Sequence, residues 1–145
     1  MIAIARLRIL FFWVLTTICM ILHFNFHVGD LFYGINIVRE GANGQKPGSL
    51  VIIRFIFEIF PLVWAVSLLY LQSIAWRRVN FFLSVPFTLA HISHVVGELK
   101  EGDPSQLLLL TFVMIMSALL TLESWKWMKS PDSVPASEQP SKIVY

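Results

Sequence analysis

Residues 9–28 read ILFFWVLTTICMILHFNFHV and contain no Lys, Arg, Asp or Glu. A run of about 20 apolar residues is long enough to cross the hydrocarbon core of a bilayer. Because lipid offers the backbone no hydrogen bonds, such a run must be helical. Arg6 and Arg8 precede it, as in a signal peptide, but no small-residue cleavage site follows. We therefore expect an uncleaved first membrane span.

Three further apolar runs follow, at about 51–75, 79–96 and 105–122. The composition agrees, with 57% hydrophobic and 14% charged residues, whereas soluble domains carry about 25% charged residues. We predict an all-α fold, a polytopic membrane protein whose residues 1–129 form a four-helix transmembrane bundle. Residues 130–145 are rich in Ser and Pro and predict a disordered cytoplasmic tail.

The basic residues predict the orientation of the bundle. We expect a tight turn at Trp76, Arg77 and Arg78, between the second and third spans. With both termini inside, seven of the 11 Lys and Arg residues lie on the cytoplasmic side: Arg6, Arg8, Arg77, Arg78, Lys126, Lys129 and Lys142. Cytoplasmic loops carry this excess of positive charge. The expected location is an integral protein of a bacterial inner membrane, in contact with the lipid bilayer.

Several classes of function are disfavoured by what the sequence lacks. The net charge is +2 and no Lys/Arg run is present, so nucleic acid is not an expected partner. Cys19 is the single cysteine, which excludes an internal disulfide and a multi-cysteine zinc site. The absence of a GxSxG motif and of a phosphate-binding loop argues against a classical hydrolase. Whether the chain is an enzyme stays open.

The four histidines form two pairs at helical spacing. His23 and His27 are four residues apart near the outer end of the first span, so they share one helix face. His91 and His94 are three residues apart near the outer end of the third span. At a rise of about 1.5 Å per residue, both pairs reach a similar depth. Since polar groups are costly in hydrocarbon, these rings should face the bundle interior and find partners.

Charged side chains surround this level of the outer leaflet. Glu58 enters the second span from the same side, and we predict it as a fifth ligand beside the histidines. Asp30 and Glu98 follow the two histidine pairs and are predicted to surround them. Arg54 precedes Glu58 by four residues. This spacing favours an intrahelical ion pair, which would make Glu58 less available to a metal.

Four interpretations of the histidines remain open. One is bis-histidine ligation of haem b, with one ring each from His23 and His91. The second is a mononuclear or dinuclear site for copper, iron or zinc. The third is a structural cluster of hydrogen bonds between helices, and the fourth is a proton relay. Pro61 and Pro86 lie inside the second and third spans, where each can kink its helix and widen the bundle.

Two families have a similar layout. The chain resembles DoxX-type membrane proteins, which are also short four-helix proteins, in having Glu58 early in the second span and the basic residues 76–78 before the third. It is also similar to four-helix cytochrome b subunits in architecture and histidine placement. Both resemblances concern topology, so we carry no functional residue across from either family.

The sequence leads to three functional hypotheses. The first is a membrane redox or metal-binding subunit that exchanges electrons with a quinol or a periplasmic partner. The second is a non-catalytic accessory subunit of a larger membrane complex, with other membrane subunits as its partners. The third is a small transporter, which is the weakest of the three because no charged residue lies near the middle of a span.

Overall fold

The computed structural model describes residues 2–38, 41–100 and 103–130. Every regular element in these ranges is helical, which confirms the predicted all-α class for the described part of the chain. The tail predicted at 130–145 lies outside the described residues except for Ser130.

The described part of the chain forms seven helical elements. They are α1 (Ile2–Gly29), η1 (Asp30–Tyr33), α2 (Gly48–Arg54), η2 (Phe55–Ile59), α3 (Phe60–Tyr70), α4 (Ile74–Glu98) and α5 (Pro104–Lys129). Because α2, η2 and α3 are continuous, they form one rod. Four helical stretches are long and apolar enough to cross a membrane, at 4–33, 48–70, 74–98 and 104–129. Each of them overlaps one predicted span.

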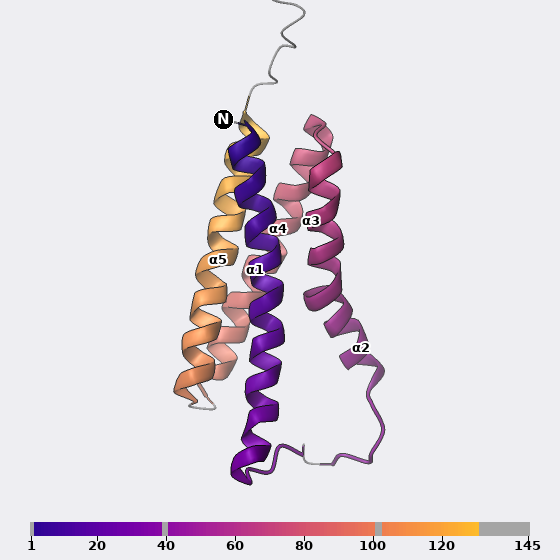
Figure 1. Cartoon of the computed structure of the whole chain (residues 1–145), viewed down its shortest axis with the longest axis vertical. Helices are drawn as coiled ribbons and strands as arrows, with labels where there is room; N and C mark the ends of the chain where they lie inside the picture. The colour runs from indigo at the N-terminus through magenta and orange to yellow at the C-terminus, as the bar shows by residue number, and fades with distance from the viewer. Residues whose placement is uncertain (1, 39–40, 101–102, 131–145) are drawn as a thin grey trace, which may run out of the picture.

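The four rods run antiparallel to their neighbours along the chain (Figure 1). Helix α1 packs between α5 and α3, and α4 packs on α5. The N-terminus, the α3–α4 turn and the end of α5 meet at the top of Figure 1, and we call this the terminal end. The α1–α2 connection and the α4–α5 connection lie at the opposite end, which we call the loop end.

The connection between the second and third rods differs from the prediction. Helix α3 ends at Tyr70 and α4 begins at Ile74, so the chain turns at residues 71–73. The tight turn predicted at residues 76–78 is therefore wrong, since these residues belong to the first turns of α4. The physical reason is a helix cap: the Ser73 hydroxyl oxygen accepts a hydrogen bond from the backbone N–H of Trp76 at 3.3 Å.

The two prolines have different effects. Before Pro61 the backbone widens into the π-helical turn η2, where the N–H of Phe60 bonds to the carbonyl of Phe55, five residues back. Proline has no N–H to donate, so the normal bond to the residue four before it is lost, and a π turn is one accommodation of that loss. Pro86 lies inside α4, which continues past it without interruption.

The interior of the bundle is unusually polar for so apolar a chain. Helix α5 buries residues at alternating spacings of four and three, the pattern of a packed helix seam. These residues are Gln106, Leu110, Val113, Ser117, Leu120, Ser124 and Trp127. Polar and apolar side chains thus share the same buried stripe. Gln106 lies toward one end of the helix and Ser124 toward the other, with Ser117 midway between them.

Asn80 of α4 joins the other three rods toward the terminal end. Its Oδ1 accepts hydrogen bonds from the indole N–H groups of Trp13 on α1, at 3.0 Å, and Trp64 on α3, at 2.8 Å. Its Nδ2 donates to Ser124 Oγ on α5 at 2.8 Å. We call these four residues the Asn80 cluster. Because each rod contributes one member, the cluster fixes how the rods are packed.

Candidate metal centre

Helix α1 supplies the first histidine pair at the loop end. The four-residue spacing places His23 and His27 one turn apart on one face, with ring centroids 4.7 Å apart and the rings nearly perpendicular. His23 is buried, and His27 is partly buried nearer the end of the helix. The face they share points toward α4 and α5, as the sequence predicted for polar groups in an apolar span.

Helix α4 supplies His91, His94 and Glu98, which contact different neighbours. His94 lies against His23, with ring centroids 4.7 Å apart and an interplanar angle of 86°. Glu98 follows one turn later and is buried. His91 instead faces Phe57 of η2, with ring centroids 5.7 Å apart. Of the second histidine pair, His94 is therefore the member that contacts His23.

Three potential metal ligands converge at the loop end. One ring nitrogen each of His23 and His27 and one carboxylate oxygen of Glu98 lie within 4.8 Å of one another. Metal–ligand bonds to these groups are about 2.0–2.2 Å long, so modest side-chain rotations would bring all three onto a single ion. Oε1 of Glu98 is buried and has no hydrogen-bond partner among the described residues.

Gln106 of α5 orients His23, a role that the sequence analysis missed. Its Oε1 is hydrogen-bonded to Nδ1 of the His23 ring. Because an amide oxygen only accepts, Nδ1 must carry the proton, and Nε2 keeps the lone pair that a metal needs. Metal-binding histidines commonly donate their other N–H in this way. The available signal was a glutamine near the start of an apolar span, at the level of the histidines.

A second group of polar residues lies apart from the Asn80 cluster. It consists of His23, His27, His94, Glu98 and Gln106, and we call it the histidine cluster. Beside it, Asp103 caps α5 and fixes the helix start that carries Gln106. Its Oδ1 accepts hydrogen bonds from the hydroxyl of Ser105, at 2.7 Å, and from the backbone N–H of Ser105, at 2.9 Å. These bonds hold the pKa of the Asp103 carboxyl below its ordinary value.

The structure does not bring Glu58 into the group of converging ligand atoms. Its Oε1 pairs instead with Nε of Arg54 at 3.1 Å, one turn away on the same rod, which is the ion pair that the sequence favoured. The Arg54 guanidinium also lies 4.3 Å above the ring of Phe24. The carboxylate that joins the histidines is Glu98, which the sequence placed around the site. Asp30 begins η1 beyond His27.

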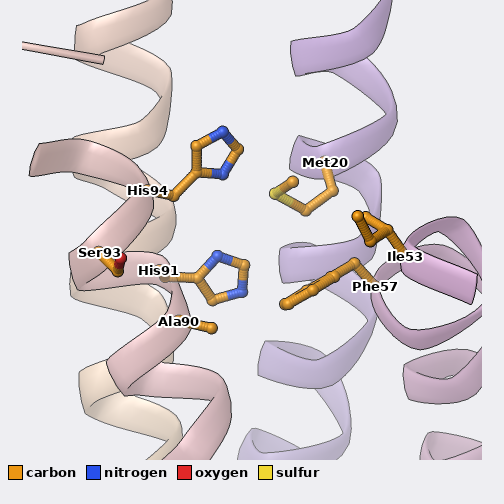
Figure 2. A pocket seen from close by; sticks show the side chains of 7 residues that line it. All are labelled: Met20, Ile53, Phe57, Ala90, His91, Ser93 and His94. Carbon is orange, nitrogen blue, oxygen red and sulfur yellow. The ribbon is translucent and has the colours of Figure 1, made fainter. Parts of the chain in front are cut away.

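His91 and His94 line a cavity of about 250 Å³ between α4, α1 and the α2–η2 segment. Figure 2 shows both rings pointing from α4 toward Met20 of α1 and Phe57 of η2. His94 thus lies between the cavity and His23 of the histidine cluster.

Comparison of the chain with protein families, with curated proteins and with solved structures found no match. The DoxX-like and cytochrome b-like resemblances therefore remain resemblances of topology alone.

Proposed function

We propose that this chain is an integral membrane protein that binds a divalent transition-metal ion at the loop end of a four-span bundle. Four helices of sufficient length and apolarity support membrane insertion. The bias of Lys and Arg toward the terminal end supports an orientation with both termini in the cytoplasm. In a bacterial inner membrane, the histidine cluster would then lie near the periplasmic surface.

A single observation carries the metal proposal: the convergence of His23, His27 and Glu98 on one point. A structural hydrogen-bond cluster is the competing explanation. In such a cluster, buried polar atoms should be paired, because an unpaired buried group costs about 1–3 kcal/mol. Oε1 of Glu98 and Nε2 of Gln106 have no partner in the described part of the chain. An ion bound to Glu98 would satisfy the first of these atoms directly.

The donor set favours particular ions. Two imidazoles and one carboxylate form the ligand set of several catalytic zinc sites, and of non-haem Fe(II) sites with open positions. Both kinds of site leave room for water or substrate. His94 lies in contact with His23 and so stands beside this ligand set. We therefore propose zinc or iron first, and copper as the next candidate.

The same geometry makes haem the less favoured cofactor. His23 and His91 were the predicted axial pair, but the ring of His23 is packed against His27 and His94, with centroids 4.7 Å away in both cases. His91 faces the cavity on the other side of His94. The cavity, about 250 Å³, is smaller than the roughly 300–1,000 Å³ of typical sites for drug-sized ligands.

The test is metal binding by full-length protein purified in detergent. After treatment with EDTA, Zn²⁺ binding is measured by calorimetry, and Co²⁺ is used as a spectroscopic probe of coordination. We expect one ion per chain. Replacing a ligand in His23→Ala, His27→Ala or Glu98→Gln should weaken binding by more than about 100-fold, beyond the range for residues that only orient ligands.

His91→Ala is the matched control, since this histidine lies on the same bundle but outside the converging group. Its metal affinity should equal that of the wild type. Equal binding in the three ligand variants would refute the site. An absorption spectrum of untreated protein tests the alternative: a Soret band lost in both His23→Ala and His91→Ala would replace the metal ion with haem.

A second candidate function is an accessory subunit of a larger membrane complex. The rod from Gly48 to Tyr70 supports it, because only 11% of its most apolar window is buried, against 28% to 33% in the other three. Its large apolar side chains are free to contact lipid or another subunit. Co-purification from mild detergent tests this function. Recovery of the chain as a monomer without other subunits would count against it.

A further inference from the structure

The cavity beside the histidine cluster has the size of a single substituted ring. An engineered protein cavity of about 150 Å³ binds benzene, and the cavity here measures about 250 Å³. Three of its walls are apolar and come from Met20, Ile53 and Phe57. Phe57 presents an aromatic ring, and Met20 a polarizable sulfur that packs well against aromatic groups. A flat ring would therefore lie between His91 of α4 and the side chains of Met20 and Phe57 that face it (Figure 2).

The α4 side of the cavity is polar, since His91, Ser93 and His94 line it. His91 is only 3% exposed, and its ring points into the cavity (Figure 2). No hydrogen-bond partner for its ring nitrogens is found among residues 2–38, 41–100 and 103–130. A neutral imidazole offers one donor and one acceptor, and buried polar groups of this kind normally have partners. The partner expected here is a polar group on a ligand.

The entrance to the cavity lies on the side of the bundle. Toward the loop end, α2 diverges from α1 (Figure 1), and the π turn η2 stands at the start of this divergence. Ile53, one of the lining residues, is 52% exposed on the outer surface of α2. In the membrane orientation proposed above, this opening faces lipid rather than water. A ligand would then enter from the outer leaflet.

We propose that this cavity binds the ring of a lipid-soluble, single-ring quinone or quinol, with His91 hydrogen-bonded to a ring oxygen. Both forms suit the imidazole, which donates to a quinone carbonyl and accepts from a quinol hydroxyl. A lipid acyl chain would fill the apolar walls but leave His91 unpaired. The proposal rests on the proposed membrane placement but not on the metal ion, and it assigns the two neighbouring sites to different ligands.

Binding is measured on the full-length protein in detergent, with EDTA present throughout. The probes are decylubiquinone, which carries a short tail, and the same benzoquinone ring without a tail. We expect decylubiquinone to bind, and to bind at least ten times more weakly in His91→Phe, which keeps the ring shape, and in Ala90→Leu, which fills the cavity. Leu89→Phe is the control, because Leu89 is an exposed neighbour that does not line the cavity.

A second measurement uses the wild-type protein alone, so it does not depend on the folding of a variant. Diethyl pyrocarbonate modifies accessible imidazoles, and mass spectrometry identifies the modified peptide. Decylubiquinone should protect His91 and leave His27 reactive. Because EDTA is present, quinone binding is measured here independently of any metal ion. Quinone binding in this assay without Zn²⁺ binding in the calorimetric assay would refute the metal site alone, and the reverse pair of results would refute this proposal alone.

The results distinguish a ring that enters from the membrane from one that enters from water. Tight binding that requires the tail supports a membrane-dissolved quinone. Equal binding of the tail-less ring, lost in His91→Phe, overturns the membrane source and assigns the cavity to a water-soluble phenol or quinone. No binding by the wild type, or unchanged binding in both His91→Phe and Ala90→Leu, overturns the ring site altogether.

Discussion

The bundle buries two polar clusters, one toward each end, that differ in how completely their atoms are paired. In the Asn80 cluster, Oδ1 and Nδ2 of Asn80 and both indole N–H groups have partners 2.8–3.0 Å away. In the histidine cluster, Oε1 of Glu98 and Nε2 of Gln106 have none among the described residues, whereas the unpaired indole Nε1 atoms of Trp76 and Trp127 at the terminal end lie outside the Asn80 cluster. A fully paired network stabilises and specifies a fold, whereas a partly paired one is a place where a ligand is expected.

The two clusters also differ in how tightly side chains pack around them. Around Asn80, large rings fill the space between the rods: Trp64 stacks on Trp76 with centroids 4.3 Å apart, and Trp13 meets Phe87 edge-on at 4.9 Å. Around the histidines, the α2–η2 segment stands away from α4 and leaves the cavity. The terminal end therefore contributes stability, and the loop end provides room for binding.

The largest effect on stability is expected from removing the centre of the Asn80 cluster. Asn80→Leu keeps the side-chain shape but leaves the indole N–H groups of Trp13 and Trp64 without acceptors. Each lost hydrogen bond costs about 0.6–1.5 kcal/mol in a membrane protein, and with the orphaned donors we expect a total of about 2–4 kcal/mol. Equilibrium unfolding in mixed micelles of SDS and a mild detergent measures this change.

The control for this change is Asn25→Leu, since Asn25 is exposed on the same rod as Trp13. It should leave the free energy of unfolding within about 0.5 kcal/mol of the wild type. If Asn80→Leu were no more destabilising than Asn25→Leu, the two ends would not differ as described, and the Asn80 cluster would not be what joins the rods.

Glu98→Gln should change the free energy of unfolding of the metal-free protein in the opposite direction, toward higher stability. A buried carboxylate with an unpaired oxygen is costly, and a neutral amide of the same size removes that charge. With EDTA present, we expect the variant to equal the wild type or exceed its stability by about 1 kcal/mol. Zn²⁺ at 100 times its dissociation constant should stabilise the wild type by about 2.7 kcal/mol, and the variant by none. The same unfolding assay, with and without Zn²⁺, gives both numbers.

Either of two results would contradict this interpretation of Glu98. A strongly destabilised Glu98→Gln in EDTA would mean that the carboxylate has a structural partner, and the histidine cluster would then resemble the Asn80 cluster. Zn²⁺ stabilisation of the variant equal to that of the wild type would place the ion elsewhere.

Gln106→Leu should weaken metal binding and leave the fold nearly unchanged. The amide oxygen selects the His23 tautomer and holds the ring, and losing such a partner typically lowers metal affinity by about 10–100-fold. Calorimetric Zn²⁺ titrations compare it with Gln45→Leu, an exposed glutamine in the connection at the same end. An unchanged affinity in Gln106→Leu would show that His23 does not need this bond to bind the ion.

The two ends also differ in what the sequence could predict. The four apolar rods follow from their composition alone, because a membrane requires long helices. The histidine depths follow from helix rise, which brought both histidine pairs, His91 included, to one level. The Asn80 cluster was missed, since a single Asn in an apolar run gives no indication of which helices it will join. Which helices an Asn side chain joins depends on how the four rods are rotated about their axes. The spacing of residues along one rod does not determine that rotation.

The carboxylate of the site shows the same limit. Helix rise placed Glu58 at the depth of the histidines and Glu98 just beyond them, so depth favoured Glu58. Two features keep Glu58 away from the histidines. Arg54 pairs with Glu58 on the same rod, and the α2–η2 segment that carries Glu58 diverges from α1 near the π turn before Pro61. Glu98 stands one turn from His94 on a rod packed against α5, so it faces His23 and Gln106.

The smallest effect is expected from Asp103, the cap that positions Gln106 at the start of α5. Asp103→Ala removes the acceptor for the Ser105 and Gln106 N–H groups and should lower the free energy of unfolding by about 1 kcal/mol.

The folded-state pKa of Asp103 lies below its ordinary value of 3.8. Its contribution is therefore complete above about pH 4 and is lost as the pH falls through the lower, folded-state pKa. Asp103→Asn keeps a capping oxygen but cannot titrate, so its stability should match the wild type near pH 7 and show less loss below pH 4. Unfolding measured from pH 7 to pH 3 distinguishes the three proteins, and an identical acid response in the wild type and Asp103→Asn would remove Asp103 as its source.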